Sequence, residues 1–68
     1  MKNRIKVARA EFDMTQADLA KRAGVSRQTI NAMELGKYVP STVLALKLAS
    51  ILKIEVSSLF KLEQEDWD

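Results

Sequence analysis

Cysteine and histidine are both absent from the 68 residues of this chain. The absence of cysteine excludes disulfides, thiolate metal sites and cysteine nucleophiles. The absence of histidine removes the commonest zinc ligand and the commonest general base. Carboxylates such as Glu11 and Asp13 remain as acid–base candidates, but no nucleophile or glycine-rich phosphate loop accompanies them. We therefore expect a protein that has no metal site and no cofactor and is not an enzyme.

Aromatic residues, glycine and proline are also scarce, with four, two and one residues respectively. Such a small number of aromatic residues argues against stacking on unpaired RNA bases. Hydrophobic residues make up 47% of the chain, and most are aliphatic residues at helical spacing. A single domain of this length buries only about 60% of the surface that its unfolded chain exposes. The composition predicts an all-α fold, a compact helical bundle with a small core.

No apolar run approaches the roughly 18 residues that cross a bilayer. Lys47 and Lys53 interrupt the most hydrophobic segment, residues 43–54. The basic residues at the start of the chain lead into no apolar signal region. We therefore expect a cytoplasmic protein that does not enter a membrane.

Charge is unevenly distributed along the chain, although the net charge is only +2. Residues 1–40 carry eight Lys or Arg against four acidic residues, a net charge of +4. Residues 41–68 carry three against five, a net charge of −2. A basic segment of this kind favours a polyanionic partner, and ordinary solvated surface charge is the alternative. We interpret Lys2, Arg4 and Lys6 as a solvated first turn, with long-range attraction of a polyanion as the alternative.

The first helix has a capping residue and a short apolar pattern. Asn3 is the expected N-terminal cap. Ile5, Ala8 and Phe12 recur at the spacing that places them on one helix face. We expect this face to point into the core and the helix to end near residues 12–13.

The second and third helices are bounded by residues that cap and end helices. Thr15 and Asp18 have the spacing of a capping box at the start of the second helix. Gly24 ends this helix, because glycine enters the left-handed conformation without steric cost. Ser26 caps the third helix after one intervening residue, and Gly36 ends it.

Two more helices are predicted in the second half of the chain. Ser41 caps a fourth helix, which is apolar almost all round and is expected to be the most buried of the bundle; its apolar positions are 44, 45, 48, 49, 51 and 52. Residues 54–60 carry a short fifth helix, capped by Glu55 or Ser57. We assign residues 1–60 to a helix-turn-helix domain and residues 61–68 to an acidic tail that frays.

Residues 16–35 form the most informative unit, two short helices joined through residues 24–26. A turn this short sends the second helix out at a steep angle, where it protrudes and fits a DNA major groove. Ala20 lies where the helices are expected to cross closely. Four apolar residues are expected to hold the two helices together: Leu19, Val25, Ile30 and Met33.

Three segments of the chain resemble the phage-repressor and Cro-like (Xre) helix-turn-helix family. They are residues 14–20 (MTQADLA), 24–30 (GVSRQTI) and 34–37 (ELGK), and the resemblance extends over residues 3–60. It implies a five-helix DNA-binding domain of a transcriptional regulator, more often a repressor. The partner that it implies is double-stranded DNA with a pseudo-palindromic operator.

The outward face at the start of the third helix carries Arg27, Gln28 and Asn31, which we expect to contact bases. Arginine pairs with the two acceptors of guanine, and Gln or Asn pairs with adenine, each contact giving about 1–3 kcal/mol of discrimination. A solvated polar face is the alternative, and for Asn31 the reach of the side chain decides. The resemblance places Gln16 and nearby backbone amides close to a phosphate, because helix N-termini attract anions.

Four more residues are expected at the DNA, mostly at its backbone. Ser26 is chiefly a helix cap, with phosphate binding as a second role. The hydroxyl of Thr29 suits a phosphate or a thymine methyl, and a purely structural role is equally open. Lys37 and Tyr38 follow the third helix, where the chain would pass beside the duplex and position the protein.

Arg9 and Glu34 match a residue pair that forms a partly buried salt bridge in similar proteins. We interpret both as structural residues that tie the first helix to the third. Removal of one partner would leave an uncompensated charge, at a cost of roughly 3–5 kcal/mol. A loss of DNA binding in an Arg9→Ala variant would therefore not prove that Arg9 contacts DNA.

The resemblance also implies a homodimer. One recognition helix reads too few base pairs for selectivity in a genome, so two half-sites lie about 34 Å apart on the operator. The candidate interface residues lie after the helix-turn-helix, with core packing favoured for Leu59 and Phe60. These candidates are Ile54, Val56, Leu59, Phe60, Leu62 and Trp67.

The acidic C-terminal segment leaves an alternative function open. An antitoxin uses the same fold to bind DNA while its C-terminal region captures a toxin protein, and an acidic tail suits a basic partner. Trp67, an aromatic residue among acidic neighbours, fits a subunit interface, a fold back over apolar surface or a disordered tail.

Overall fold

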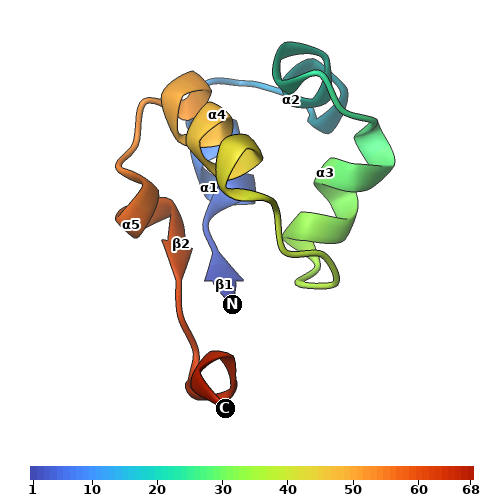
Figure 1. Cartoon of the computed structure of the whole chain (residues 1–68). Coiled ribbons are helices and arrows are strands. Elements are labelled where there is room, and N and C mark those ends of the chain that lie inside the picture. The colour runs from blue at the N-terminus through green and yellow to red at the C-terminus, as the bar shows by residue number, and fades with distance from the viewer.

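The computed structural model describes all 68 residues and contains five α-helices, a two-stranded ribbon and a C-terminal 3₁₀ helix (Figure 1). The predicted all-α five-helix fold is confirmed. The helices are α1 (Ile5–Glu11), α2 (Gln16–Ala23), α3 (Arg27–Glu34), α4 (Thr42–Leu52) and α5 (Val56–Leu59). The remaining elements are β1 (Lys2–Asn3), β2 (Phe60–Lys61) and the 3₁₀ helix η1 (Gln64–Trp67).

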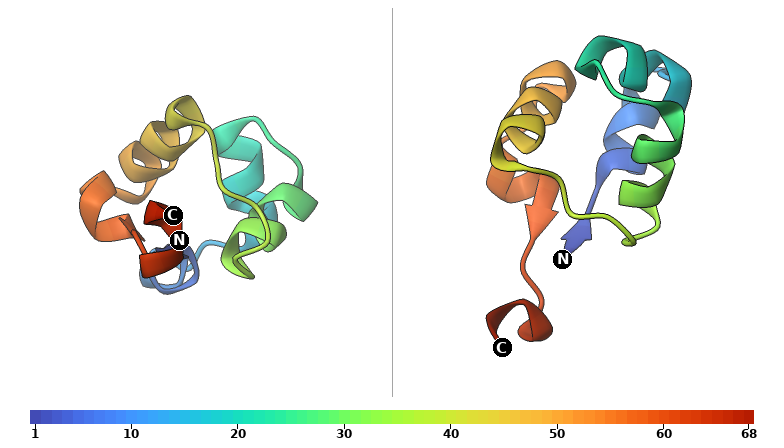
Figure 2. Two further views of the ribbon diagram at one scale, coloured as in Figure 1. Left: turned by 60° about the horizontal axis from the view of Figure 1, so that its bottom comes forward. Right: turned by 45° about the vertical axis from the view of Figure 1, so that its right-hand side comes forward.

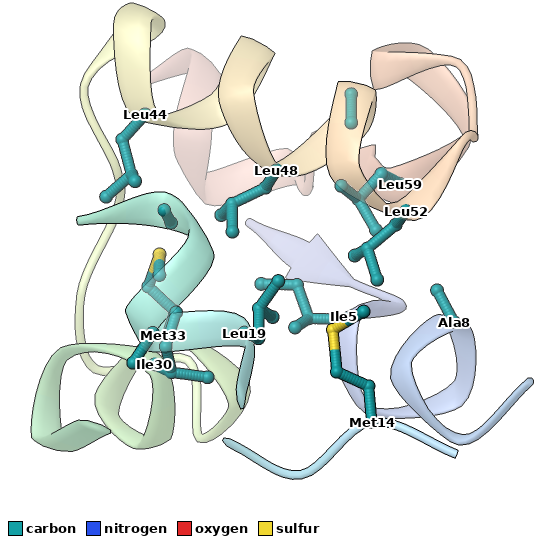
Figure 3. Close-up of a cluster of buried hydrophobic side chains, with 13 residues drawn as sticks. Ile5, Ala8, Met14, Leu19, Ile30, Met33, Leu44, Leu48, Leu52 and Leu59 are labelled. Atoms are coloured by element: carbon teal, nitrogen blue, oxygen red, sulfur yellow. The ribbon is translucent and has the colours of Figure 1, made fainter. Parts of the chain in front are cut away.

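The helices surround one apolar core. Figure 2 shows α2 and α3 on one side of the molecule and α4 and α5 on the other. Thirteen hydrophobic residues are buried and no polar or charged residue is. Leu44, Leu48 and Leu52 point inward from α4 toward the side chains of the N-terminal helices (Figure 3). Each helix therefore contributes to burial that no single helix of this length could achieve alone.

The predicted caps of the three middle helices are confirmed. Thr15 and Asp18 form the capping box, with the Thr15 Oγ1 accepting from the Asp18 amide at 3.0 Å. Ser26 and Ser41 accept from the amides three residues on, at 3.1 and 3.2 Å. Gly24 ends α2 in the left-handed conformation, with φ of 75°. Local sequence therefore sets the bounds of the elements that carry the helix-turn-helix.

The start of the chain forms a ribbon that the sequence did not predict. β1 and β2 pair antiparallel, with Lys2 opposite Lys61 and Asn3 opposite Phe60. The prediction that Asn3 caps the first helix is wrong in position, because Asn3 belongs to β1 and Arg4 is the N-cap. The Asn3 Oδ1 still accepts a hydrogen bond from the Ile5 amide at 3.2 Å, and the Asn3 Nδ2 donates to the Met33 carbonyl at 2.8 Å.

One prediction of burial is also wrong. Phe12 is 45% exposed, because α1 ends at Glu11 and the chain turns before Phe12 can align with Ile5. The fourth helix contributes four buried residues, more than any other helix, as predicted, while its Val43 and Leu46 are 66% and 53% exposed. We name the surface around these two residues, with Val39 and Val56, the α4 outer face. No helix in the structure is long and apolar enough to cross a membrane.

The C-terminal segment is folded against the start of the chain. The Met1 amine lies 3.0 Å from the Glu63 carboxylate and 3.1 Å from that of Asp66. These contacts raise the pKa of the Met1 amine. The hydrogen bond from the Glu63 backbone amide, followed by the one from the Met1 amine, lowers the pKa of Asp66. The fraying predicted for residues 61–68 is therefore not found. Trp67 is 74% exposed, so it does not fold back over apolar surface.

Candidate nucleic-acid interface

The turn between α2 and α3 positions the candidate interface. Gly24 reverses the backbone with its positive φ, and the Val25 amide donates to the Ala20 carbonyl at 3.0 Å. Val25 packs against the core, which holds the turn in place. Ile30 and Met33 are fully buried on the inner side of α3. The opposite side of α3 therefore has to face outward (Figure 1).

The predicted base-contacting residues come together on this outward side. Arg27, Gln28 and Asn31 are all exposed. Together with Gln16 from the start of α2 they line a polar hollow of about 270 Å³ that contains no hydrophobic residue. Two helices thus contribute to one concave polar surface. Such a surface is better suited to the hydrogen-bonding groups on base edges than to an apolar partner.

Arg9 and Glu34 form the predicted ion pair, directly behind this hollow. The Arg9 Nε lies 2.8 Å from Glu34 Oε2, and Nη2 lies 3.1 Å from Oε1. The Arg9 Nη1 also donates to the Met14 carbonyl at 2.8 Å. The hydrogen bonds to Glu34 raise the pKa of the Arg9 guanidinium. The pair joins α1 to α3 with side chains that are only 15% and 7% exposed.

Gln16 connects this ion pair to the outward face of α3. Its Nε2 donates to Glu34 Oε1 at 3.1 Å and to Asn31 Oδ1 at 3.1 Å. Both amide hydrogens of Gln16 are therefore used within the protein, which leaves only its carbonyl oxygen free. The family resemblance predicted that Gln16 and nearby backbone amides lie close to a phosphate. The donors that remain available to such a phosphate are the backbone amides at the start of α2.

The hydroxyls of Ser26 and Thr29 lie against each other at the start of α3. Their oxygens are 2.9 Å apart, and the Ser26 Oγ also accepts from the Thr29 amide. The capping role of Ser26 is confirmed. Each hydroxyl still has a free lone pair or hydrogen, because one hydroxyl bond uses only part of its capacity.

Lys37 and Tyr38 lie beyond the opposite end of α3. The Lys37 amide donates to the Ala32 carbonyl at 2.9 Å and the Gly36 amide to the Met33 carbonyl at 3.0 Å, which closes the helix end. Both side chains are exposed. They do not line the polar hollow, from which the length of α3 separates them.

One contributor to the site was missed by sequence reasoning. Glu34 was assigned only to the ion pair, whereas it also holds the Gln16 amide. Its spacing of three residues from Asn31 placed both on one face of the helix, and this was the available signal.

Two short helices in this geometry, the second with an exposed polar face, define a helix-turn-helix DNA-binding domain. The model of the helix-turn-helix family HTH_3 matches residues 5–59, and the chain belongs to this family. The family is one of DNA-binding transcriptional regulators, not of enzymes.

Known proteins that resemble the chain agree with this class. The uncharacterized HTH-type transcriptional regulator MJ0272 of Methanocaldococcus jannaschii is 48% identical over 97% of this chain and 100% of its own. The crystal structure of the restriction-modification controller protein C.AhdI of Aeromonas hydrophila has a TM-score of 0.75 at 34% identity, covering 82% of this chain and 85% of its own. The N-terminal DNA-binding domain of SinR from Bacillus subtilis has a TM-score of 0.76 at 26% identity and covers 88% of both chains.

Proposed function

We propose that this protein is a cytoplasmic repressor that binds a pseudo-palindromic operator as a homodimer, with the first half of α3 in the major groove. The observation that carries the proposal is the polar hollow. Gln16, Arg27, Gln28 and Asn31 line it without any apolar residue, although they come from two helices. A repressor of this size acts by occupying DNA that polymerase needs.

Arg27 and Gln28 are the principal base-reading residues of this proposal. Both lie in the first turn of α3, which enters a major groove first in helix-turn-helix domains. No intramolecular hydrogen bond or ion pair engages either side chain. Arg27 is assigned to the N7 and O6 of a guanine, and Gln28 to the N6 and N7 of an adenine.

Contacts to the DNA backbone flank these readers. The first amides of α2, at Gln16 and Ala17, precede the hydrogen-bond ladder of the helix and are assigned to a phosphate. The Ser26 and Thr29 hydroxyls and the Lys37 and Tyr38 side chains are assigned to the backbone at either end of α3. These groups position the protein and do not distinguish sequences.

The α4 outer face supports the homodimer. Val39, Val43 and Leu46 are between 53% and 66% exposed, which is unusual for neighbouring aliphatic residues on a small monomer. Leu46 lies at the centre, because it lines the shallow hollows on both sides of α4. Of the interface candidates from the sequence, Leu59 is in the core, whereas Val56 and Phe60 are half-buried beside Leu46.

The antitoxin alternative has less support. It rests on a free acidic tail, and Glu63 and Asp66, two of the four acidic residues in that tail, are engaged by the Met1 amine.

The experiment that tests the proposal is selection of bound sequences from a pool of random duplex DNA by the full chain. The expected result is enrichment of a two-fold symmetric sequence with half-sites about 34 Å apart. Affinity for the enriched duplex should fall steeply with salt, with a logarithmic slope of about −0.9 for each phosphate contact. Enrichment of no sequence would overturn the proposal.

A further inference from the structure

The segment after β2 projects from the helical domain and exposes its apolar side chains. We name residues 62–68 the arm; it includes η1 and is drawn in red below the helices in Figure 1. Leu62 and Trp67 are 61% and 74% exposed, and Trp67 is the only tryptophan of the chain. A tryptophan left in water forgoes the hydrophobic stabilisation that burial of so large a side chain provides.

Hydrogen bonds and ion pairs hold the arm in this projecting conformation. Glu63 and Asp66 form a capping box, in which the Asp66 Oδ2 accepts from the Glu63 amide at 2.7 Å. The Met1 amine contacts both carboxylates, at 3.0 and 3.1 Å. Trp67 is therefore presented on a short ordered element, which lowers the entropy lost when a partner covers it.

An apolar groove opens beside the start of the arm. Its volume is about 300 Å³, and six of its eight lining residues are hydrophobic. Leu46 and Val56 of the α4 outer face line it, together with Phe60, which lies two residues before the arm. Trp67 of the same chain is not among the lining residues. The groove is at the small end of the volumes of about 300–1,000 Å³ that hold ligands, so it suits one large apolar side chain.

The charges around the α4 outer face are opposite to those of the arm. The shallow hollows on the two sides of Leu46 contain three basic residues and one acidic residue: Arg22, Lys47, Lys53 and Glu55. The arm carries four acidic residues and no basic one, and its Glu65 and Asp68 take part in no ion pair. An arm therefore complements an α4 outer face in charge, whereas two arms or two such faces would repel each other.

We infer that the arm of one protomer docks on the α4 outer face of a second copy of the chain, with its Trp67 in the groove of that copy. This inference deepens the proposed homodimer and rests on it. Because Phe60 lines the groove, the arm starts next to it, and a two-fold axis near this point exchanges the two arms. Each contact is then matched by its symmetry copy, which closes the assembly as a dimer.

The fluorescence of Trp67 reports this docking, because no other tryptophan contributes. Dilution of the full chain should shift the emission to longer wavelength as the dimer dissociates and Trp67 meets water. Trp67→Ala should raise the dimer dissociation constant, measured by sedimentation equilibrium, at least about a hundredfold, since each dimer loses two buried tryptophans. Phe12→Ala is the matched control: Phe12 is 45% exposed, lies outside the arm and the α4 outer face, and should leave the constant unchanged.

Thr42→Glu tests the groove while the arm stays intact. Thr42 lines the groove in the first turn of α4, where a carboxylate favours the helix dipole, so the variant should fold. The added charge repels the acidic arm and has to be desolvated under Trp67, so this dimer should also dissociate. Circular dichroism confirms that each variant is folded.

Mixing the two variants tests whether the contact forms between chains. At a concentration where Thr42→Glu and Trp67→Ala are each monomeric, the intact arm of the first meets the intact groove of the second. Trp67→Ala contains no tryptophan, so the emission comes from Thr42→Glu alone and should shift to shorter wavelength on mixing.

The outcomes separate this inference from the proposed function. A wild-type dimer whose emission does not change on dilution, a Trp67→Ala dimer of unchanged affinity, or no shift on mixing would overturn arm docking, while the proposed dimer on DNA stands. A monomeric wild-type chain would overturn the inference and the homodimer together. Selection from random duplex DNA then decides separately whether the proposed operator binding stands.

Discussion

Arg9 and Glu34 make a two-point contact, with nitrogen–oxygen distances of 2.8 and 3.1 Å, across the 25 residues that separate them in sequence. This contact ties α1 to α3. It also adjoins the polar hollow, since Glu34 accepts a hydrogen bond from Gln16, which lines the hollow. One ion pair therefore serves both the stability of the domain and the geometry of its interface.

Removal of Arg9 should destabilise the domain severely. In Arg9→Ala the Glu34 carboxylate, only 7% exposed, loses its charged partner, at an expected cost of about 3 kcal/mol. A domain of this size has on the order of 3–10 kcal/mol in total. Urea unfolding monitored by circular dichroism measures the change in the free energy of unfolding.

The matched control for Arg9→Ala replaces both partners, as Arg9→Met with Glu34→Leu. It leaves no uncompensated charge and should recover most of the lost stability. A single variant that loses less than about 1 kcal/mol, the range of a surface ion pair, would show that the pair is solvated.

The capping box of α2 should make stability depend on pH in acid. Hydrogen bonds from the Thr15 backbone amide and then its hydroxyl hold the pKa of Asp18 below its usual value. A carboxyl group with a lower pKa in the folded state stabilises the protein above its unfolded pKa, and this contribution is lost as the pH falls through the folded pKa. Stability should therefore decline below about pH 4.

Asp18→Asn removes the titrating group and isolates this effect. Carboxyl groups titrate between about pH 5 and about pH 2. Over this range the free energy of unfolding of the variant should change less than that of the wild type. Asp13→Asn is the control, because the Asp13 carboxylate takes part in no hydrogen bond or ion pair. Equal pH dependence of the Asp18 variant and the wild type would contradict the role of the capping box.

The sequence predicted those parts of the fold that depend on neighbouring residues. Thr15, Ser26 and Ser41 each cap a helix through an amide three residues away, so their roles are visible locally. The ribbon of β1 and β2 was missed because strands of two residues show no alternation. Phe12 was misplaced because periodicity does not determine where α1 stops.

In the candidate site, too, the sequence predicted the features that depend on neighbouring residues and missed those that depend on distant ones. The outward side of α3 followed from the inward side, since Ile30 and Met33 had to be buried. The orientation of the Gln16 amide did not follow, because it depends on a carboxylate 18 residues away. The exposure of Val43 and Leu46 was also hidden, because an apolar residue looks the same in sequence whether it faces the core or a partner.

Disruption of the α4 outer face should separate the proposed dimer. A charge at Leu46, the centre of this face, has to be desolvated in any interface, so Leu46→Asp should be monomeric. Multi-angle light scattering should give about twice the chain mass of 7.7 kDa for the wild type and this mass for the variant.

Val7→Asp is the control for Leu46→Asp. Val7 is 50% exposed on α1, close to the 53% of Leu46, and it lies outside the α4 outer face. A dimeric Leu46→Asp variant would contradict the assignment of this face, and a monomeric wild type at the same concentration would contradict the dimer itself.

The double variant Arg27→Ala with Gln28→Ala tests whether these two residues read bases in the proposed complex with DNA. Both residues are exposed, so the variant should keep the helical circular dichroism of the wild type. Lys6→Ala with Gln64→Ala is the matched control, because it removes one positive charge and one amide from exposed positions outside the hollow.

Fluorescence anisotropy on the duplex enriched by the wild type provides the measurement. Loss of two base contacts at about 1–3 kcal/mol each predicts at least a 30-fold weaker affinity for the double variant and little change for the control. Affinity of the folded double variant equal to that of the wild type would contradict the assignment of α3 as the recognition helix.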